Sequence, residues 1–142
     1  MTEAPEDLVF EFDLVVADAD IDMLGHASNI AFVRWIQDVA MAHSAAVGLG
    51  FEVYQRIGAV FVVVRQQIDY LRPALRGDVV QARTWLSNVG AAKCERSSHL
   101  LRKSDGQMLA KALTTWGFID MASGRPTRIP QDVRVAFKGY IH

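Results

Sequence analysis

The pattern of apolar and polar positions changes its period twice along the chain. Residues 8–17 are rich in Val, Phe and Leu and begin with alternating apolar and acidic positions, which predicts a strand. Residues 29–47 carry apolar side chains at the spacing of one helical face, and Ser28 or Asn29 suits an N-cap, so a long helix is predicted. The pattern then returns to strands, which we expect at 59–72, 78–89, 92–104 and 107–121.

Turn residues separate these predicted strands. Pro73 with Gly77-Asp78, then Gly90, then Ser104-Asp105-Gly106 mark the breaks, and the last is typical of a hairpin. One long helix after the first strand, followed by a four-strand antiparallel meander, predicts an α+β fold in which the antiparallel sheet wraps around the central helix. The wholly apolar run 59–64 predicts a strand buried on both faces. We further expect a short amphipathic turn at 51–57 and a short helix in the tail 124–142.

Length and charge narrow the class of protein. The 142 residues fit a single domain, 1–142, with its core at about 8–137. With 15 basic and 16 acidic residues, the net charge of -1 argues against a nucleic-acid or membrane-surface partner, and no apolar run is long enough to span a bilayer. Cys94 is the single cysteine, so no intramolecular disulfide forms, and the acidic N-terminus does not resemble a secretory signal; we expect a cytoplasmic protein.

The densest polar cluster lies between the first strand and the helix and reads Asp18-x-Asp20-x-Asp22-x-x-Gly25-His26-x-x-Asn29. Three alternating carboxylates suggest a calcium loop, which needs glycine at the sixth position and glutamate at the twelfth. Those positions hold Met23 and Asn29, so no metal site is expected. Asp and Asn also shape turns and cap helices in proteins of every function, and this purely structural role remains open from spacing alone.

The same segment resembles a known family. Residues 20–29, DIDMLGHASN, with Phe32, resemble the signature of hotdog-fold proteins of the 4-hydroxybenzoyl-CoA thioesterase type. Two further segments, DYLRPA at 69–74 followed by Gly77-Asp78, and GRP at 124–126 with Arg128-Ile129-Pro130, are similar to segments that recur in that family. The resemblance covers roughly residues 10–137 and implies a single hotdog domain.

The resemblance also implies roles for individual residues. Asp22 falls on the family's catalytic aspartate, acting as nucleophile or general base, and a backbone amide near Asn29 would stabilise the oxyanion at the helix N-terminus. His26 is a candidate to orient the carboxylate, and Gly25 and Phe32 are candidates for substrate binding. Phe32 stands where several hydroxybenzoyl-CoA enzymes have tyrosine, so a fatty or other apolar acyl group is at least as well supported.

By the same resemblance, coenzyme A would be bound by basic residues at a subunit edge. The candidates are Arg96, Arg102, Lys103, Arg125 and Arg128. We single out Arg96, although charged residues on a strand most often lie on a solvated face. The expected protein is a homodimer or homotetramer with its active site between subunits, no metal, and no cofactor besides the CoA of its substrate.

Two other histidines are assigned no catalytic role. His43 lies on the apolar stripe of the predicted helix and is expected to be a satisfied core histidine. Cys94 and His99 are five residues apart in one predicted strand, so they should lie on opposite faces and not form a nucleophilic pair. The predicted function is hydrolysis of an acyl-CoA thioester; a thioesterase acting on acyl carrier protein, or a non-catalytic acyl-CoA-binding protein, are the alternatives.

Overall fold

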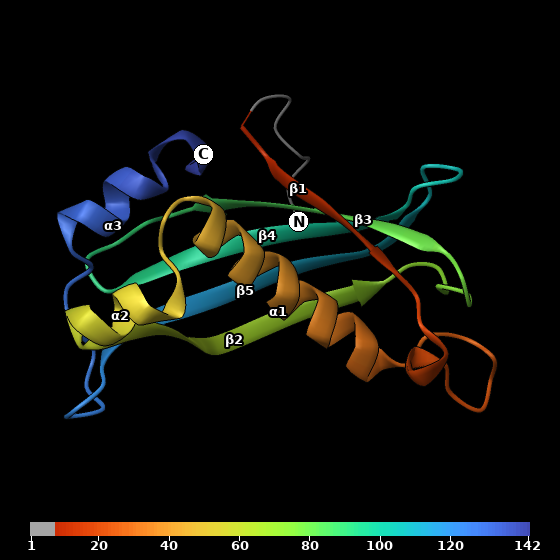
Figure 1. The fold of residues 1–142 in the computed structure, drawn as a ribbon, viewed down its shortest axis with the longest axis horizontal. Helices are drawn as coiled ribbons and strands as arrows, with labels where there is room; N and C mark the ends of the chain where they lie inside the picture. Colours follow the sequence, from red (N-terminus) through yellow and green to blue (C-terminus); the bar gives the residue numbers. More distant parts are fainter. Residues whose placement is uncertain (1–7) are drawn as a thin grey trace.

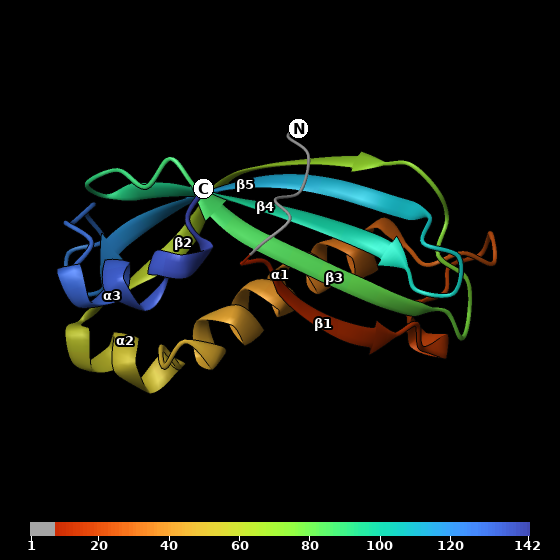
Figure 2. The ribbon, with the colours of Figure 1, turned by 90° about the horizontal axis from the view of Figure 1, so that it is seen from above.

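A computed structural model describes residues 8–142 (Figure 1). The strands are β1 Phe10–Val15, β2 Ala59–Tyr70, β3 Val79–Ser87, β4 Lys93–Arg102 and β5 Met108–Asp120. The α-helices are α1 Asn29–Ala46, α2 Phe51–Ile57 and α3 Gln131–Ala136, and short 3-10 turns occur at Asp18–Asp20 and Lys138–Tyr140. The expected α+β arrangement is confirmed, because the five antiparallel strands form one curved sheet with α1 on its inner side (Figure 2).

The long helix α1 begins and ends where its sequence predicts. The Ser28 hydroxyl caps it by accepting a hydrogen bond from the Ala31 amide at 3.2 Å. Beyond its end, Gly48 adopts φ 86°, a left-handed conformation that suits glycine. The buried side chains of α1 are those of Ala31, Phe32, Trp35, Ile36, Val39, Ala40 and His43. This face packs into the curved sheet and fixes the direction of α1 across it.

The strand order corrects the predicted meander. The sheet runs β1-β3-β4-β5-β2, so β2 pairs with β5 at the far edge and not with β3, which follows it in sequence. Residues 71–78 link β2 to β3 across the end of the sheet, where the Leu71 amide donates to Leu109 O and the Val16 amide donates to Asp78 O. Pro73 and Gly77 resemble a hairpin break, but eight linking residues reach further than a tight turn.

The edge position of β2 also corrects the prediction that 59–64 is buried on both faces. Val62, Val63 and Val64 are 38%, 42% and 51% exposed in the single chain. An exposed apolar edge strand offers unpaired backbone groups to another strand.

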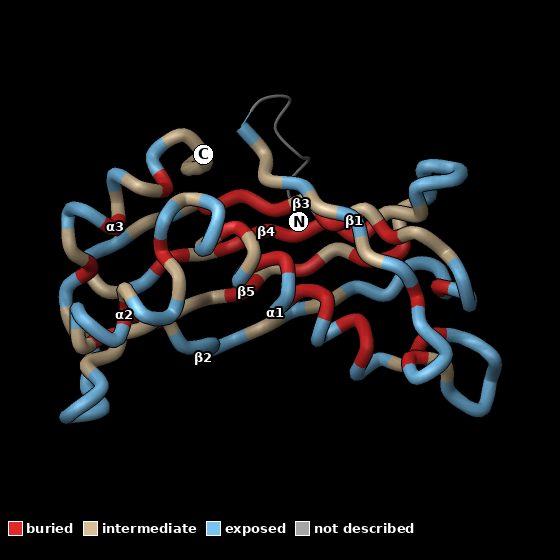
Figure 3. The backbone as a smooth tube through the Cα atoms, viewed as in Figure 1, coloured by how far each residue is buried: buried red, intermediate tan, exposed pale blue. Residues whose placement is uncertain are grey.

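The buried apolar residues form two clusters. Figure 3 shows where the buried residues lie along the chain. The larger one joins α1 to the inner faces of β3, β4 and β5, with Phe32, Trp35 and Leu100 among its members. The smaller one lies beneath α2 and α3 and includes Phe118 and Phe137. Between them, buried polar side chains interrupt the inner face of the sheet. No helix within residues 8–142 is long and apolar enough to cross a membrane.

Candidate active site

The loop that carries Asp22 is a tight, hydrogen-bonded turn. Ile21 and Ala27 form an isolated antiparallel bridge, the Asp22 amide donates to His26 O at 2.8 Å, and the Gly25 amide donates to Asp22 O at 3.1 Å. Gly25 has φ 80°, which explains why glycine stands there. The Asp22 carboxylate accepts a hydrogen bond from the Leu24 amide at 2.9 Å and is otherwise exposed, as is His26. The turn thus holds an open carboxylate at a fixed position.

Asp20 anchors this turn to the helix. It is only 5% exposed, it accepts a hydrogen bond from the Ala17 amide at 2.9 Å, and it forms an ion pair with Arg34 of α1. Burial opposes ionisation of Asp20, but the Ala17 amide and the Arg34 guanidinium outweigh it and keep the pKa of this carboxyl below its ordinary value. The Asp20 carbonyl also accepts from the Ser28 amide at 2.9 Å. Asp20 is therefore a positioning residue for both Asp22 and the start of α1.

The first amides of α1 are available to a ligand. Ala31 N–H is taken by the Ser28 hydroxyl and Phe32 N–H by the Ser28 carbonyl, whereas the Asn29 and Ile30 amides have no hydrogen-bond partner among the described residues. Both residues are exposed. Such unpaired amides at the positive end of a helix dipole suit an oxyanion. The bridge at Ala27 brings them beside the turn that carries Asp22.

Phe32 lies beneath this site, within the core. It is 3% exposed, with its ring centroid 5.0 Å from that of Trp35 and 5.4 Å from that of Tyr70. The structure therefore brings Asp22, Gly25, His26 and Asn29 together at the surface and keeps Phe32 inside, where it supports the first turn of α1.

Arg96 lies far from that loop and is not on a solvated face. It is 4% exposed on the inner side of β4, and its Nη1 donates to His43 Nδ1 at 2.9 Å and to Thr84 Oγ1 at 3.0 Å. The Phe137 ring lies 5.9 Å from the guanidinium carbon. Arg96 therefore lies inside the fold on the inner side of the sheet, and its role in binding coenzyme A stays a prediction.

The basic side chains Arg102 and Lys103 are already paired. Arg102 binds Asp78 and Asp105, each through a carboxylate, and also donates to Pro73 O, while Lys103 pairs with Asp13. These contacts raise the pKa of Arg102, most strongly through the Asp78 hydrogen bond. Of the five basic candidates, only Arg125 and Arg128 are exposed without an ion pair among the described residues.

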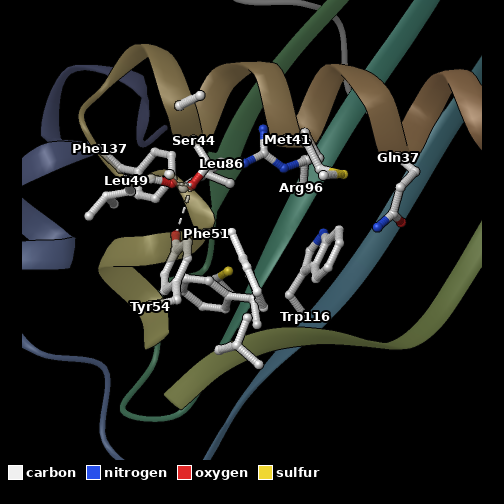
Figure 4. A pocket seen from close by; sticks show the side chains of 16 residues that line it. Gln37, Met41, Ser44, Leu49, Phe51, Tyr54, Leu86, Arg96, Trp116 and Phe137 are labelled. Atoms are coloured by element: carbon white, nitrogen blue, oxygen red, sulfur yellow. Dashed lines mark hydrogen bonds between the residues drawn. The ribbon is translucent and has the colours of Figure 1, made fainter. Parts of the chain in front are cut away.

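A cavity of about 400 Å³ opens at the other end of α1 (Figure 4). It lies between the C-terminal half of α1, the short helix α2 and the inner face of the sheet. Its walls are largely apolar, with Met41, Leu49, Phe51, Phe61, Leu86 and Trp116 contributing. Tyr54 of α2 and Ser44 of α1 close one side through a hydrogen bond of 2.8 Å between their hydroxyls.

Most of the α1 residues that line this cavity lie outside the apolar face on which the helix prediction rests. Gln37, Met41 and Ser44 do not belong to the buried face of α1, yet they line the cavity. Ile30 and Val33, 77% and 43% exposed, continue the same stripe at helical spacing towards the Asp22 loop. A second stripe on α1, which mixes apolar and polar side chains, thus runs from the loop to the cavity.

His43 behaves as a core histidine, but only one of its nitrogens is satisfied. It is fully buried among the rings of Phe10, Phe137 and Tyr140, with centroid distances of 4.9, 5.1 and 4.4 Å. Burial, and then the Arg96 charge, lower the pKa of His43 to about 3. Its Nδ1 accepts from Arg96, so the ring proton is on Nε2, which has no partner among the described residues.

Cys94 is not a nucleophile in this setting. It lies on the inner face of β4, whereas His99, five residues later, is on the outer face, as the strand period predicts. Burial raises the pKa of the Cys94 thiol to about 11, so the thiolate is scarce at neutral pH.

The aspartates of the loop do not assemble a metal site. Asp18 pairs with Arg76 at 2.8 Å and Asp20 pairs with Arg34, so two of the three carboxylates are directed at arginines. Within residues 8–142, no three His, Cys, Asp or Glu side chains are arranged to hold a metal ion.

Comparison with known proteins identifies the family. The sequence profile of the thioesterase-like superfamily matches residues 16–137, which include both the Asp22 loop and the cavity. The chain belongs to that superfamily. Among curated relatives of this thioesterase-like chain, the chloroplastic palmitoyl-acyl carrier protein thioesterase of Gossypium hirsutum is 28% identical over 133 residues, and that of Arabidopsis thaliana is 26% identical over 140. These matches cover 89% and 94% of this chain but only 32% and 34% of the relatives, so the chain spans about a third of their length.

Solved structures show the same hotdog fold. A 1,4-dihydroxy-2-naphthoyl-CoA thioesterase from Synechocystis superimposes with a TM-score of 0.85 at 20% identity, covering 92% of this thioesterase-like chain and 96% of the other. A Staphylococcus aureus protein in complex with CoA gives a TM-score of 0.88 at 16% identity, covering 98% and 87%. The hotdog fold expected for this chain is confirmed.

Proposed function

We propose that this protein hydrolyses an acyl-coenzyme A to a free acid and CoA, with Asp22 as the catalytic residue. The observation that carries the proposal is the pairing of two features: the open Asp22 carboxylate and the two unpaired amides of Asn29 and Ile30, joined by one hydrogen-bonded turn. A carboxylate beside an oxyanion site can supply both the nucleophile or base and the oxyanion stabilisation that hydrolysis of a thioester needs. Membership of the thioesterase-like superfamily supports the same reaction.

The reaction can follow either of two routes from this geometry. The thioester carbonyl oxygen would accept hydrogen bonds from the α1 amides. Asp22 then attacks the carbonyl carbon and expels the CoA thiolate, giving a mixed anhydride that water hydrolyses, or it takes a proton from water as that water adds to the carbonyl. In both routes the thiolate leaves and is protonated, and the acid is released. His26 is exposed within the same turn and is placed to contact the substrate or orient Asp22.

The site is more complete in a dimer. The exposed edge of β2 suits antiparallel pairing with β2 of a second copy. A two-fold axis through that pair reverses α1, so the Asp22 loop of the partner subunit approaches the cavity end of this one. Within one chain, the helical rise separates Asn29 from Gln37 and Ser44 by roughly 12 to 22 Å. We therefore propose a homo-oligomer whose active site combines one subunit's loop with the other's cavity.

The apolar cavity favours a fatty or other apolar acyl group. Its walls offer few polar groups, and the cavity is partly open to solvent, so a chain can enter. The relatives named above are palmitoyl-acyl carrier protein thioesterases. An acyl group carried by acyl carrier protein is therefore the second candidate for the substrate. The buried thiol of Cys94, with no disulfide, fits the cytoplasmic setting that we expect.

A thiol-release screen tests the proposed function. Purified protein is given acyl-CoAs with aromatic, short aliphatic and long aliphatic groups, and the same acyl groups on acyl carrier protein, while free thiol is followed spectrophotometrically. We expect turnover of at least one apolar acyl-CoA. Binding of acyl-CoA without release of thiol would instead identify a non-catalytic acyl-CoA-binding protein. Hydrolysis of the acyl carrier protein thioesters alone would show that the acyl group is carried by that protein and not by CoA.

A further inference from the structure

The cavity contains a buried cation for which residues 8–142 supply no counterion. Arg96 is 4% exposed and lines the cavity. It forms no ion pair with the described residues, and neither of its hydrogen bonds involves a carboxylate. Its two hydrogen-bond partners, His43 and Thr84, are neutral, and both are reached by the same nitrogen, Nη1. Nε of Arg96 is buried and has no acceptor among the described residues. A buried charge without an opposite charge lowers the stability of the folded protein, so buried guanidinium groups are normally paired with an anion.

A second donor at the same place also lacks an acceptor. Nε1 of Trp116 is buried and has no partner among the described residues. Trp116 pairs with Cys94 across the sheet, and Arg96 is two residues further along β4, so both side chains project from the same face. Figure 4 shows both side chains between α1 and the sheet, with the Arg96 guanidinium beside Met41 and the Trp116 indole below it. Two hydrogen-bond donors that have no acceptor among the described residues therefore border the same apolar cavity.

None of the described residues at this site neutralises the Arg96 charge. Among them, the cavity lining includes no Asp or Glu. Burial raises the pKa of Tyr54, and it raises that of Cys94 to about 11, so both remain neutral at physiological pH. Burial lowers the pKa of Arg96 to about 10, which still leaves the guanidinium protonated. The Ser44 hydroxyl donates to Leu49 O and accepts from Tyr54, so its hydrogen bonds are already made.

We infer that the cavity binds an apolar chain that ends in a carboxylate, with the carboxylate directed at Arg96 and Trp116. A carboxylate accepts hydrogen bonds and offers no donor, so it satisfies both groups and neutralises the cation. The walls formed by Met41, Leu49 and Phe61 receive the chain. This chemistry has two sources: the far carboxyl of a dicarboxylic acyl group attached to CoA, or a free fatty acid such as the product. The first source rests on the proposed function, whereas the binding itself does not.

The first test is equilibrium binding, which needs no catalysis. Decanoate, decan-1-ol and decylamine are titrated into the wild-type protein by calorimetry at pH 7.5. We expect decanoate to bind at least about tenfold more tightly than decan-1-ol, because a hydrogen bond to a charged group adds at least that factor, and decylamine to bind most weakly. Equal affinity for decanoate and decan-1-ol would overturn the inference, whatever the enzyme hydrolyses.

Variants locate the binding. Arg96→Met should remove the preference for decanoate while keeping affinity for decan-1-ol. Arg83→Met on β3 is the matched control: Arg83 pairs with Glu11 away from the cavity and should keep the preference. If Arg96→Met does not fold, Ala45→Trp at the cavity wall takes its place and should abolish decanoate binding. A preference that survives in folded Arg96→Met, or decanoate binding that survives in Ala45→Trp, contradicts the inference.

A kinetic comparison distinguishes the two sources. The CoA thioester of decanedioic acid and decanoyl-CoA are compared by kcat/KM in the wild type and in Arg96→Met. A wild-type preference for the diacid thioester that disappears in Arg96→Met identifies the substrate's far carboxyl as the ligand. Equal kcat/KM values, with inhibition by decanoate that is lost in Arg96→Met, identify the free acid. If no thioester is hydrolysed, the proposed function fails while the binding result stands.

Discussion

Arg34, on the second turn of α1, pairs with the buried carboxylate of Asp20, and this contact ties the candidate catalytic turn to the helix whose amides would bind the oxyanion. The three aspartates of the loop therefore have three different environments. Asp18 pairs with Arg76 in solvent, Asp20 is buried and paired, and Asp22 is open. This difference allows their roles to be separated by substitution.

Asp22→Asn should lower kcat by at least about 10²-fold, because it keeps the shape of the side chain but removes the charge that drives the chemical step. KM and the melting temperature should change little, since Asp22 is exposed. Asp18→Asn is the matched control and should retain nearly full kcat. Steady-state kinetics and thermal unfolding on the same preparations provide the measurement; an Asp22→Asn enzyme with more than about a third of wild-type kcat excludes the mechanism.

Asp20→Asn should act mainly through stability. It removes the charge that pairs with Arg34 and weakens the hydrogen bond from the Ala17 amide, so the free energy of unfolding should fall by about 1 to 3 kcal/mol. Chemical denaturation measures this change. An Asp20→Asn protein as stable as the wild type, with kcat as low as that of Asp22→Asn, would instead place Asp20 in the chemical step.

Activity should survive extensive treatment with EDTA. Asp18 and Asp20 are directed at arginines, and the proposed chemistry uses only Asp22 and backbone amides. The assay is thiol release before and after dialysis against the chelator. Loss of activity that calcium or another divalent ion restores would reopen a metal role for the loop.

The protein should sediment as a dimer or larger assembly at micromolar concentration, because the apolar edge of β2 is otherwise left exposed. Val64→Lys places a charge on that edge, where Val64 is 51% exposed, and should shift the protein towards monomer and lower its activity. Val135→Lys on α3, where the valine is 57% exposed, serves as the control with equal charge. A fully active wild-type monomer would rule out the shared site.

Stability should decline on acidification because of His43. Its pKa is about 3 in the folded protein and about 6.5 when unfolded, so the unfolded chain takes up a proton first as the pH falls. Its contribution is therefore full above pH 6.5 and is lost towards pH 3, at about 1.4 kcal/mol per pH unit. His43→Gln should flatten this part of the pH profile. An unchanged profile in His43→Gln would assign the loss to other groups.

The sequence was most informative where local chemistry determines structure. The Ser28 cap, the apolar face of α1 and the strands were all predictable, because each depends on neighbours in the chain. Strand order was not predictable, since periodicity does not reveal which edge β2 joins. Arg96 was misplaced because a charge usually indicates a solvated face, although it alternates in step with the buried Leu100 and so belongs to the inner side.

The seven-residue helix α2 is a short, separate element at the cavity end of α1. It begins after Gly50, ends at the left-handed Gly58, and contributes Phe51 and Tyr54 to the cavity lining. Lengthening or shortening this segment would reshape the cavity proposed for the acyl chain, while the Asp22 turn lies at the opposite end of α1. In the proposed enzyme, acyl-chain length and catalytic rate would therefore depend on separate segments of the chain, and each could be altered by substitutions that leave the other unchanged.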